Sequence, residues 1–192
     1  ASRIEGEHGG ALTVLLRWLK RGAIVVAVVA ISLLGLRAWD AVRGEPLRAW
    51  HTWIPPELTA EEMDHADWQQ YLAAEAKIFD EMGKEVIHKL GDEDRVPVNR
   101  YFEDSPVYPG HFAEEWNRSY ILEPDGPPVG AVVFLHGLTD SPYSLRHIAR
   151  RYAEHGYVAI GIRMPGHGTV PAGLTDVRWE DWYAATRLAV RE

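Results

Sequence analysis

The chain of 192 residues contains no cysteine, which excludes a disulfide framework and a thiolate nucleophile. Positive charge is also scarce, because 20 lysines and arginines stand against 28 acidic residues and leave a net charge of -8. Nucleic-acid binding needs clustered cations, and the sequence after Glu57 has no such cluster, so we expect no nucleic-acid partner. The hydrophobic share of 46% and the charged share of 25% are typical of a folded globular protein.

Motifs for metals and cofactors are missing as well. His147 and His155 lie eight positions apart, whereas a zinc-binding helix places two histidines four positions apart. We therefore expect no metal and no cofactor. The sequence also lacks internal repeats and low-complexity tracts, so nothing indicates a repeat protein or a disordered chain.

One long apolar run stands near the N-terminus. Gly22 to Leu36 is uncharged over 15 residues, and basic residues flank it on both sides. At about 1.5 Å per residue the run covers about 22 Å, less than the bilayer core of about 30 Å. Trp18 and Trp39 can extend it to both membrane interfaces. We expect a single uncleaved transmembrane signal anchor over residues 22–39.

Two alternatives to the anchor stay open, namely a cleaved signal peptide and a buried core helix. The residues after Leu36 offer no good Ala-x-Ala cleavage pattern, which disfavours the signal peptide. The basic residues before the run slightly outnumber those after it, Arg3, Arg17, Lys20 and Arg21 against Arg37, Arg43 and Arg48. This bias predicts a cytoplasmic tail over 1–21 and a body on the extracytoplasmic side.

The region after the anchor divides into two parts. Residues 40–58 hold several prolines and are predicted to be a juxtamembrane linker, whose tryptophans lie in the bilayer interface or cap the globular body. Residues 59–117 form a helical and loop-rich extension. Thr59 and Glu62 have capping-box spacing, and the helix they begin is expected to end at Gly91, with a division at Gly83. Its apolar stripe is Trp68, Leu72, Ala76, Phe79, Met82, Val86 and Leu90.

The most informative stretch begins at Gly130. Ala131 to Leu135 is the continuous apolar run of a strand covered on both faces in a parallel sheet, and it leads into a His-Gly loop. A helix follows, capped by Ser141, with Leu145, Ile148, Ala149 and Tyr152 on its inner face and Gly156 at its end. Tyr157 to Ile162 is the next strand, and it leads into a second glycine-bearing loop. The two loops are expected at one edge of the sheet.

The elements on either side of this unit are predicted less sharply. Arg118 to Leu122 is a strand candidate, and Asp125-Gly126 makes a turn toward the next strand. Val177 to Arg191 is predicted to be a helix with Thr175 or Asp176 as its cap. Its buried side is expected to contain Trp179, Trp182, Ala185, Leu188 and Ala189. Asn117-Arg118-Ser119 spells a glycosylation sequon that we do not expect to be used.

HGLTDSPYS and RMPGHGT, the two loop sequences, carry a family resemblance. The stretch from Arg118 to Glu192 resembles the N-terminal half of the α/β-hydrolase catalytic domain, in particular bacterial carboxylesterases and monoacylglycerol-lipase-like enzymes of the serine aminopeptidase group. The resemblance implies an α/β fold, with a mostly parallel sheet and flanking helices over 118–192. It also implies that the Leu138 backbone N–H donates to an oxyanion and that His136 and Gly137 shape that loop. Supporting residues from the second loop are Gly166, His167 and Gly168.

The catalytic triad of that family is not in this sequence. No Gly-x-Ser-x-Gly occurs, and the family places its Asp and His later still. Ser141 and Ser144 are interpreted as residues of a helix start, and His136 and His167 as loop scaffolding. We thus expect the front half of a membrane-anchored serine esterase or lipase that acts on carboxylic or acyl esters, including lipid-derived ones.

Two other functions stay open. The chain could be a non-enzymatic or split-protein fragment that binds a partner chain, because the strand at 131–135 would otherwise lack a neighbour that completes the sheet. An aspartate at the nucleophile position would instead indicate dehalogenase-like chemistry on the same fold. Neither the nucleophile nor the substrate is specified by these residues.

Overall fold

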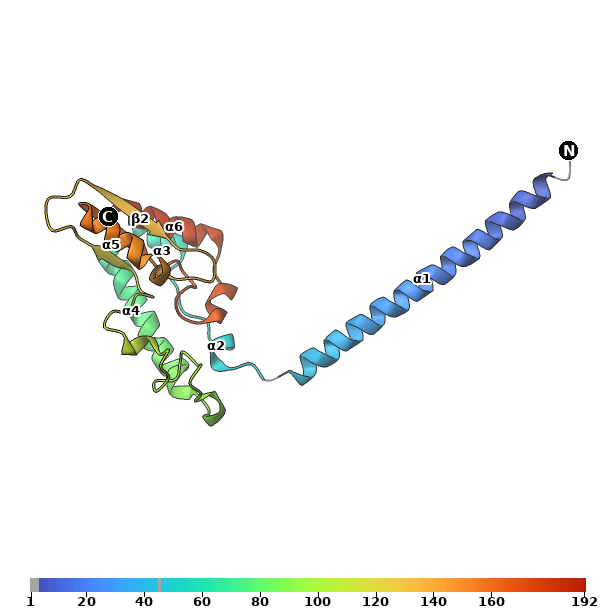
Figure 1. Cartoon of the computed structure of the whole chain (residues 1–192), viewed down its shortest axis with the longest axis horizontal. Coiled ribbons are helices and arrows are strands. Elements are labelled where there is room, and N and C mark those ends of the chain that lie inside the picture. The colour runs from blue at the N-terminus through green and yellow to red at the C-terminus, as the bar shows by residue number, and fades with distance from the viewer. Residues whose placement is uncertain (1–3, 45) are drawn as a thin grey trace. The chain divides into compact units, whose positions relative to one another are not determined.

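The computed structural model describes the backbone of residues 4–44 and 46–192, which belong to two compact units, 1–46 and 47–192. Residues 1–3 of the expected tail, including Arg3, and residue 45 of the expected linker lie outside the described residues. The first unit is the helix α1, Ile4–Arg43 (Figure 1). Its part Leu16–Arg43 is long and apolar enough to cross a membrane, and none of it is buried. A signal sequence also has these properties.

The second unit begins inside the expected linker. The helix α1 extends to Arg43, and the short helix α2, Ala49–Thr52, already belongs to the second unit. Trp50 stacks on Tyr101 with ring centroids 5.4 Å apart, and both Trp50 and Trp53 pack against a buried apolar cluster. Of the two alternatives for these tryptophans, the structure therefore has the one in which they cap the globular body.

The long helix predicted from Thr59 is two helices, α3, Ala60–His65, and α4, Trp68–Glu85. The start is confirmed, because the Thr59 side chain accepts a hydrogen bond from the Glu62 amide and the Glu62 side chain accepts one from the Thr59 amide. The break was missed. Asp67 and Gln70 form a second capping box that starts α4.

The predicted end and stripe of this helix were partly wrong. Gly83 lies inside α4, which ends at Glu85, before Gly91, and two short 3₁₀ turns follow, Ile87–Lys89 and Asp92–Asp94. Ala76 is exposed and Leu72 half-buried. The buried side of α4 is instead Trp68, Tyr71, Glu75, Ile78 and Phe79. Tyr71 and Glu75 face the body because both bind Arg163.

Three strands form a small mixed sheet in the order β1-β3-β2. β2, Gly130–Leu135, runs parallel to β3, Tyr157–Ile162, with Gly130 opposite Tyr157 and Leu135 opposite Ile162. β1, Tyr120–Leu122, pairs with β3 in the antiparallel direction. The predicted strands are present with closely matching bounds. The expected mostly parallel sheet is mixed, because β1 enters from the opposite end.

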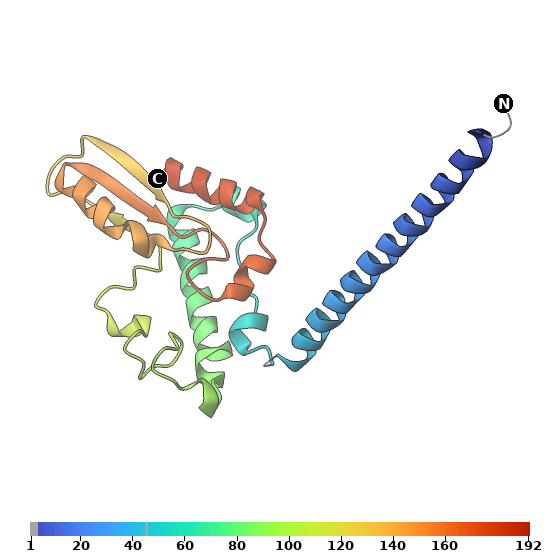
Figure 2. The same cartoon turned by 45° about the vertical axis from the view of Figure 1, so that its right-hand side comes forward.

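Helices cover both faces of the sheet (Figures 1 and 2). Side chains alternate between faces along a strand. Ile160 and Ile162 of β3 pack in the core with Leu188 of α6, Trp179–Arg191, and with residues of α3 and α4. On the other face Phe134 meets Tyr152 of α5, Arg146–Glu154, with ring centroids 5.5 Å apart. Two parallel strands joined through α5 thus form the predicted β-α-β unit.

Several expected buried positions are exposed. β2 is an edge strand that is only partly buried, and Leu135 is 47% exposed, so the prediction of cover on both faces was wrong. Ile148, Tyr152 and Trp179 are 51%, 41% and 67% exposed. The cap of α6 is Arg178, whose amide donates to Asp181, so neither Thr175 nor Asp176 caps it. Amphipathic spacing locates a helix but not the edge of the core it packs on.

Replacing Asp67 by alanine tests the second capping box. The Asp67→Ala variant should lower the free energy of unfolding by about 1 kcal/mol, because the Gln70 amide at the start of α4 loses its acceptor. Gln69→Ala, at an exposed position of the same helix, is the control and should have little effect. Chemical denaturation followed by tryptophan fluorescence measures both. Equal stability of the two variants would contradict the role of the cap.

Candidate functional site

Two loops meet where β2 and β3 end. Because these strands are parallel, the loop after Leu135 and the loop after Ile162 leave the sheet at the same edge. A cavity of about 490 Å³ lies between them. The first loop contributes residues 139–141 and the second contributes residues 167–171. The rest of the wall is Arg100, Tyr101, Asn117, Tyr143 and Leu174.

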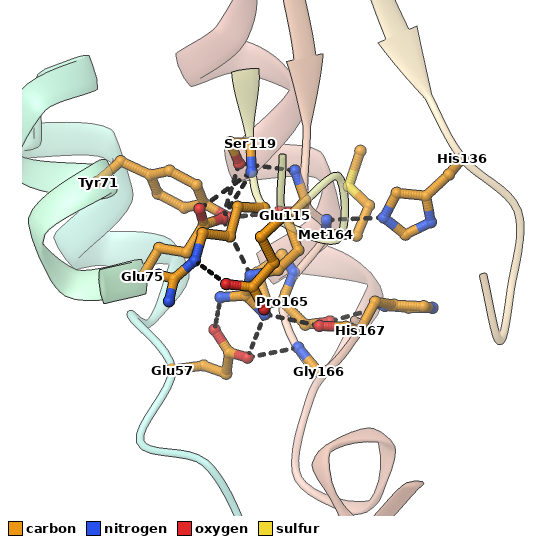
Figure 3. Close-up of polar contacts among 12 residues, drawn as sticks. Glu57, Tyr71, Glu75, Glu115, Ser119, His136, Met164, Pro165, Gly166 and His167 are labelled. Atoms are coloured by element: carbon orange, nitrogen blue, oxygen red, sulfur yellow. Dashed lines mark hydrogen bonds and ion pairs between the residues drawn. The ribbon is translucent and has the colours of Figure 1, made fainter. Parts of the chain in front are cut away.

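His136 joins the two loops. Its Nε2 accepts a hydrogen bond of 3.0 Å from the Met164 amide (Figure 3). The ring proton is therefore on Nδ1, which lies 3.0 Å from the Gly137 carbonyl oxygen. Burial lowers the pKa of His136, the bond to Gly137 opposes this, and the nearby His167 lowers it further. Both ring nitrogens are therefore engaged in a neutral imidazole, which suits the predicted scaffolding role and not that of a general base.

The bonds at Gly137 orient the next peptide. The Gly137 carbonyl oxygen accepts a hydrogen bond from Nδ1 of the His136 ring and a second one, of 3.2 Å, from the Asp140 amide. In a trans peptide the carbonyl and the following N–H point in opposite directions, so the Leu138 N–H points away from both. It donates no hydrogen bond to any residue that the structure describes, and Leu138 is 68% exposed. The expected oxyanion donor is thus an oriented N–H without an internal acceptor.

Gly137 occupies a position that has room for a side chain. A Cβ on Gly137 would meet no atom within 4 Å, and this residue does not have a positive φ. The left-handed residue of the loop is Thr139, with φ of 63°. A bond from the Asp140 amide to the Gly137 carbonyl makes 137–140 a turn whose third position normally favours glycine. A β-branched residue there carries backbone strain of about 1–3 kcal/mol, which is common at functional sites.

Glycines are indispensable in the second loop. Gly166 and Gly168 have φ of 79° and 74°. A Cβ on Gly166 would lie 2.7 Å from the Gly173 carbonyl oxygen, and one on Gly168 would lie 2.8 Å from that of Asn117. Both positions therefore combine left-handed backbone with close backbone packing. His167, between them, is buried, and its ring lies 4.9 Å from that of His136 and 5.6 Å from that of Trp182.

A buried ion network holds this loop (Figure 3). Arg163 is 1% exposed, and its guanidinium forms two bonds of 2.8 Å with the Glu57 carboxylate and one of 3.1 Å with Glu75. The same group donates to the His167 carbonyl at 2.9 Å, and Glu57 also accepts from the Gly166 amide at 2.8 Å. Burial alone would lower the pKa of Arg163, but the charge and hydrogen bonds of Glu57, together with smaller effects of Tyr71 and Glu75, raise this pKa.

The network extends to β1 and α4. The Ser119 hydroxyl donates to Glu75 at 2.8 Å and accepts from the Arg163 amide at 2.8 Å. The Tyr71 hydroxyl donates to the Arg163 carbonyl. Ser119, a member of the sequon spelled by 117–119, is thus committed to internal bonds. Asn117 also has an internal bond, because its side-chain oxygen accepts from the Ser141 hydroxyl at 2.8 Å.

The two serines of the first loop have structural partners. Ser141 precedes the 3₁₀ turn Pro142–Leu145, but its hydroxyl binds Asn117, so the expected side-chain cap was wrong. The Ser144 hydroxyl lies 3.3 Å from the Ser141 carbonyl. Neither hydroxyl contacts a histidine within the described part of the chain. The described part of the chain also contains no group of three or more His, Cys, Asp or Glu side chains that could hold a metal ion.

Sequence reasoning missed Glu57, Glu75 and Arg163. A signal was available for two of them. Arg163 directly follows an apolar strand, and Glu75 lies among apolar residues on one side of α4. Charged side chains that are buried at such positions are almost always paired. Glu57, which lies between Pro56 and Leu58 in a loop, carried no comparable signal.

Comparisons with known proteins give a partial relationship. No protein-family model matches the chain. A stretch of 58 residues is 40% identical to the thermostable monoacylglycerol lipase of Bacillus sp. (strain H-257), and it covers 30% of this chain and 23% of that enzyme. The identity supports an α/β-hydrolase relationship. The chain thus matches less than a quarter of the length of this relative.

A similar solved structure comes from work on LipS and LipT, two metagenome-derived lipolytic enzymes. It is 34% identical over 40% of this chain and 30% of its own, with a TM-score of 0.36. The expected resemblance is supported, through the identity to the monoacylglycerol lipase, at the level of an α/β-hydrolase relationship.

Arg163→Met tests the buried network. The variant leaves two buried carboxylates without their cation and should lower the free energy of unfolding by about 3–5 kcal/mol. Arg187→Met removes one partner of the exposed pair with Asp64, so it is the matched control and should change stability little. Denaturant unfolding of both variants in the same detergent gives the comparison. A similar small loss in both would show that the network contributes little.

A second test uses the pH dependence of stability. The pKa of His136 is below its ordinary value of 6.5 in the folded chain, so as the pH falls the unfolded chain takes up this proton first. The stability linked to His136 is full above about pH 7 and is lost as the pH falls through the lower folded pKa. Between about pH 7.5 and pH 5 the wild-type free energy of unfolding should fall, and His136→Gln should make this fall smaller. His147→Gln, at an exposed position, should show the same fall as the wild type. Identical pH profiles for wild type and His136→Gln would refute this assignment.

Proposed function

We propose that these 192 residues are the anchored front part of a serine hydrolase that cleaves carboxylic or acyl esters of lipid origin. The chain supplies one oxyanion donor, the Leu138 N–H, and the loops that fix it. The nucleophilic serine and its Asp and His partners come from residues outside the 192. The observation that carries the proposal is the fixed Gly137–Leu138 peptide at the joint edge of β2 and β3.

The chemistry follows from the orientation of this peptide. When a nucleophile attacks an ester carbonyl, negative charge develops on the carbonyl oxygen, and a donor already in position stabilises it without reorganisation. The His136 ring and the Asp140 amide hold the Gly137 carbonyl from one side, so the Leu138 N–H stays available on the other. The second loop acts through the bond from the Met164 amide to His136. Gly166, His167 and Gly168 are thus positioning residues.

Membrane attachment is a further part of the proposal. The part Leu16–Arg43 of α1 has the length and composition of a membrane span, and its tryptophans and basic residues suit the interfaces. We place the body on the extracytoplasmic side. Such a location would bring the cavity near lipid-derived esters.

A second function is favoured by the free edge of β2. This strand pairs only with β3 among the described residues, and an unpaired apolar edge invites another strand. A partner chain that completes the sheet would make these residues one component of a split protein. The coding sequence after residue 192 separates the readings, because an open frame that reaches Gly-x-Ser-x-Gly favours the hydrolase and a stop codon favours the split protein.

Leu138→Pro tests the oxyanion donor, since proline lacks the N–H. In the protein that includes the residues following this chain, the variant should lower kcat for p-nitrophenyl acyl esters by about a hundredfold or more. Leu138→Ala keeps the N–H and, at an exposed position, should retain activity. Circular dichroism checks that both variants fold.

The 192-residue chain by itself is the negative control and should show no turnover. Robust hydrolysis by this chain would mean that its nucleophile lies within the 192 residues. Equal kcat for Leu138→Pro and Leu138→Ala would remove the Leu138 N–H from the mechanism.

A further inference from the structure

A second hollow lies next to the cavity between the two loops. It has a volume of about 350 Å³, and apolar side chains form much of its wall, Val107, Pro109, Phe112, Trp116 and Tyr143. Three residues, Arg100, Asn117 and Tyr143, line both the hollow and the cavity. The two spaces are therefore neighbours with a shared wall, and we call them the apolar hollow and the loop cavity.

The wall of the apolar hollow is attached to the candidate site. Asn117 accepts a hydrogen bond of 2.8 Å from Ser141 of the first loop, and its carbonyl lies against Gly168 of the second loop. Arg100 donates to the Gly168 carbonyl at 3.5 Å. The segment 100–117 is thus held at the edge of the sheet by both loops, and the hollow it forms has a fixed position relative to Leu138.

Large apolar side chains are left open to water in this hollow. Val107, Phe112 and Tyr143 are 49%, 57% and 46% exposed. Exposed apolar area is unfavourable in water, and clustered exposure around a concave surface is typical of binding sites. An apolar ligand would remove this area from water.

Cations surround the hollow in a chain of net negative charge. Arg146 lies over the Tyr143 ring at 3.6 Å and Arg150 over the Trp116 ring at 4.7 Å, and Arg100 lines the wall. None of these three forms an ion pair with a carboxylate of the described residues. The wall also contains two acidic residues, Glu114 and Glu115. The charge of Glu115 is balanced by its ion pair with Arg118. An apolar surface bounded by unpaired cations suits an amphiphile whose polar end accepts hydrogen bonds.

We infer that the segment 100–117 forms an acyl-chain groove that leads into the loop cavity. The aliphatic chain of a lipid ester lies against Val107, Phe112 and Trp116, and its polar end passes Arg100 toward the loops. This inference rests on the proposed hydrolytic function and specifies its substrate class as long-chain acyl esters. The extension before the sheet thereby contributes to substrate selection.

Photoaffinity labelling tests the groove in the 192-residue chain, which needs no turnover. The chain is placed in lipid nanodiscs and irradiated with a long-chain monoacylglycerol that carries a diazirine in its acyl chain, and labelled peptides are located by mass spectrometry. We expect adducts within 107–116 that unlabelled monoolein displaces and that a short-chain glycerol butyrate does not. Phe112→Asp should reduce this labelling at least fivefold.

Val98→Asp is the matched control, because Val98 is 85% exposed and lies outside both spaces, and it should keep the labelling. Adducts confined to α1, or labelling of 107–116 that Phe112→Asp does not change, would overturn the groove. A further control uses nanodiscs that contain a diazirine phospholipid. If this phospholipid labels 107–116 and monoolein does not displace the label, the surface docks on the bilayer, and the proposed groove is also overturned.

The two proposals fail separately. If the longer protein hydrolyses esters through Leu138 but 107–116 takes no label, the groove is wrong and the hydrolase stands. If the label enters the groove and Leu138→Pro matches Leu138→Ala in activity, the oxyanion role is wrong and lipid binding stands.

Discussion

The buried ion network around Arg163 is the constraint on which the rest of the body depends. It brings together the end of β3, the loop before α3 and the middle of α4, because Glu57 and Glu75 both bind the same guanidinium. Charges of this kind cost several kcal/mol each to bury, and the cost is offset only when every partner is in place. The sheet, the second loop and the helices of the extension therefore reach their positions together.

From Arg163 a continuous series of contacts leads to the candidate oxyanion donor. The guanidinium fixes the carbonyl of His167, and Glu57 fixes the amide of Gly166. The loop so held presents the Met164 amide to His136, which in turn holds the Gly137 carbonyl. Fixed dipoles act on developing charge without reorganising, so a rigid loop is a chemical requirement of the proposed reaction. Thr139, with its positive φ, lies in the same turn.

The extension before the sheet is part of the site. It supplies Glu75 of the network, the Asn117 bond to the first loop, and Arg100 and Asn117 in the wall shared by the apolar hollow and the loop cavity, while Glu57 lies just before it. Residue 117, the expected end of the extension, lies within the single compact unit 47–192. The match to the monoacylglycerol lipase covers 30% of the chain.

Local patterns in the sequence determined the strands β2 and β3, the capping box at Thr59 and the left-handed glycine at 156, because each depends on residues close together in the chain. Only the tertiary structure decided which charges meet, since Arg163 is 106 residues from Glu57 and 88 from Glu75. It also decided which side of α4 is buried and how far β2 is covered. Hydrogen bonds within one turn are encoded by neighbours, whereas ion pairs and burial depend on where the whole chain places distant segments.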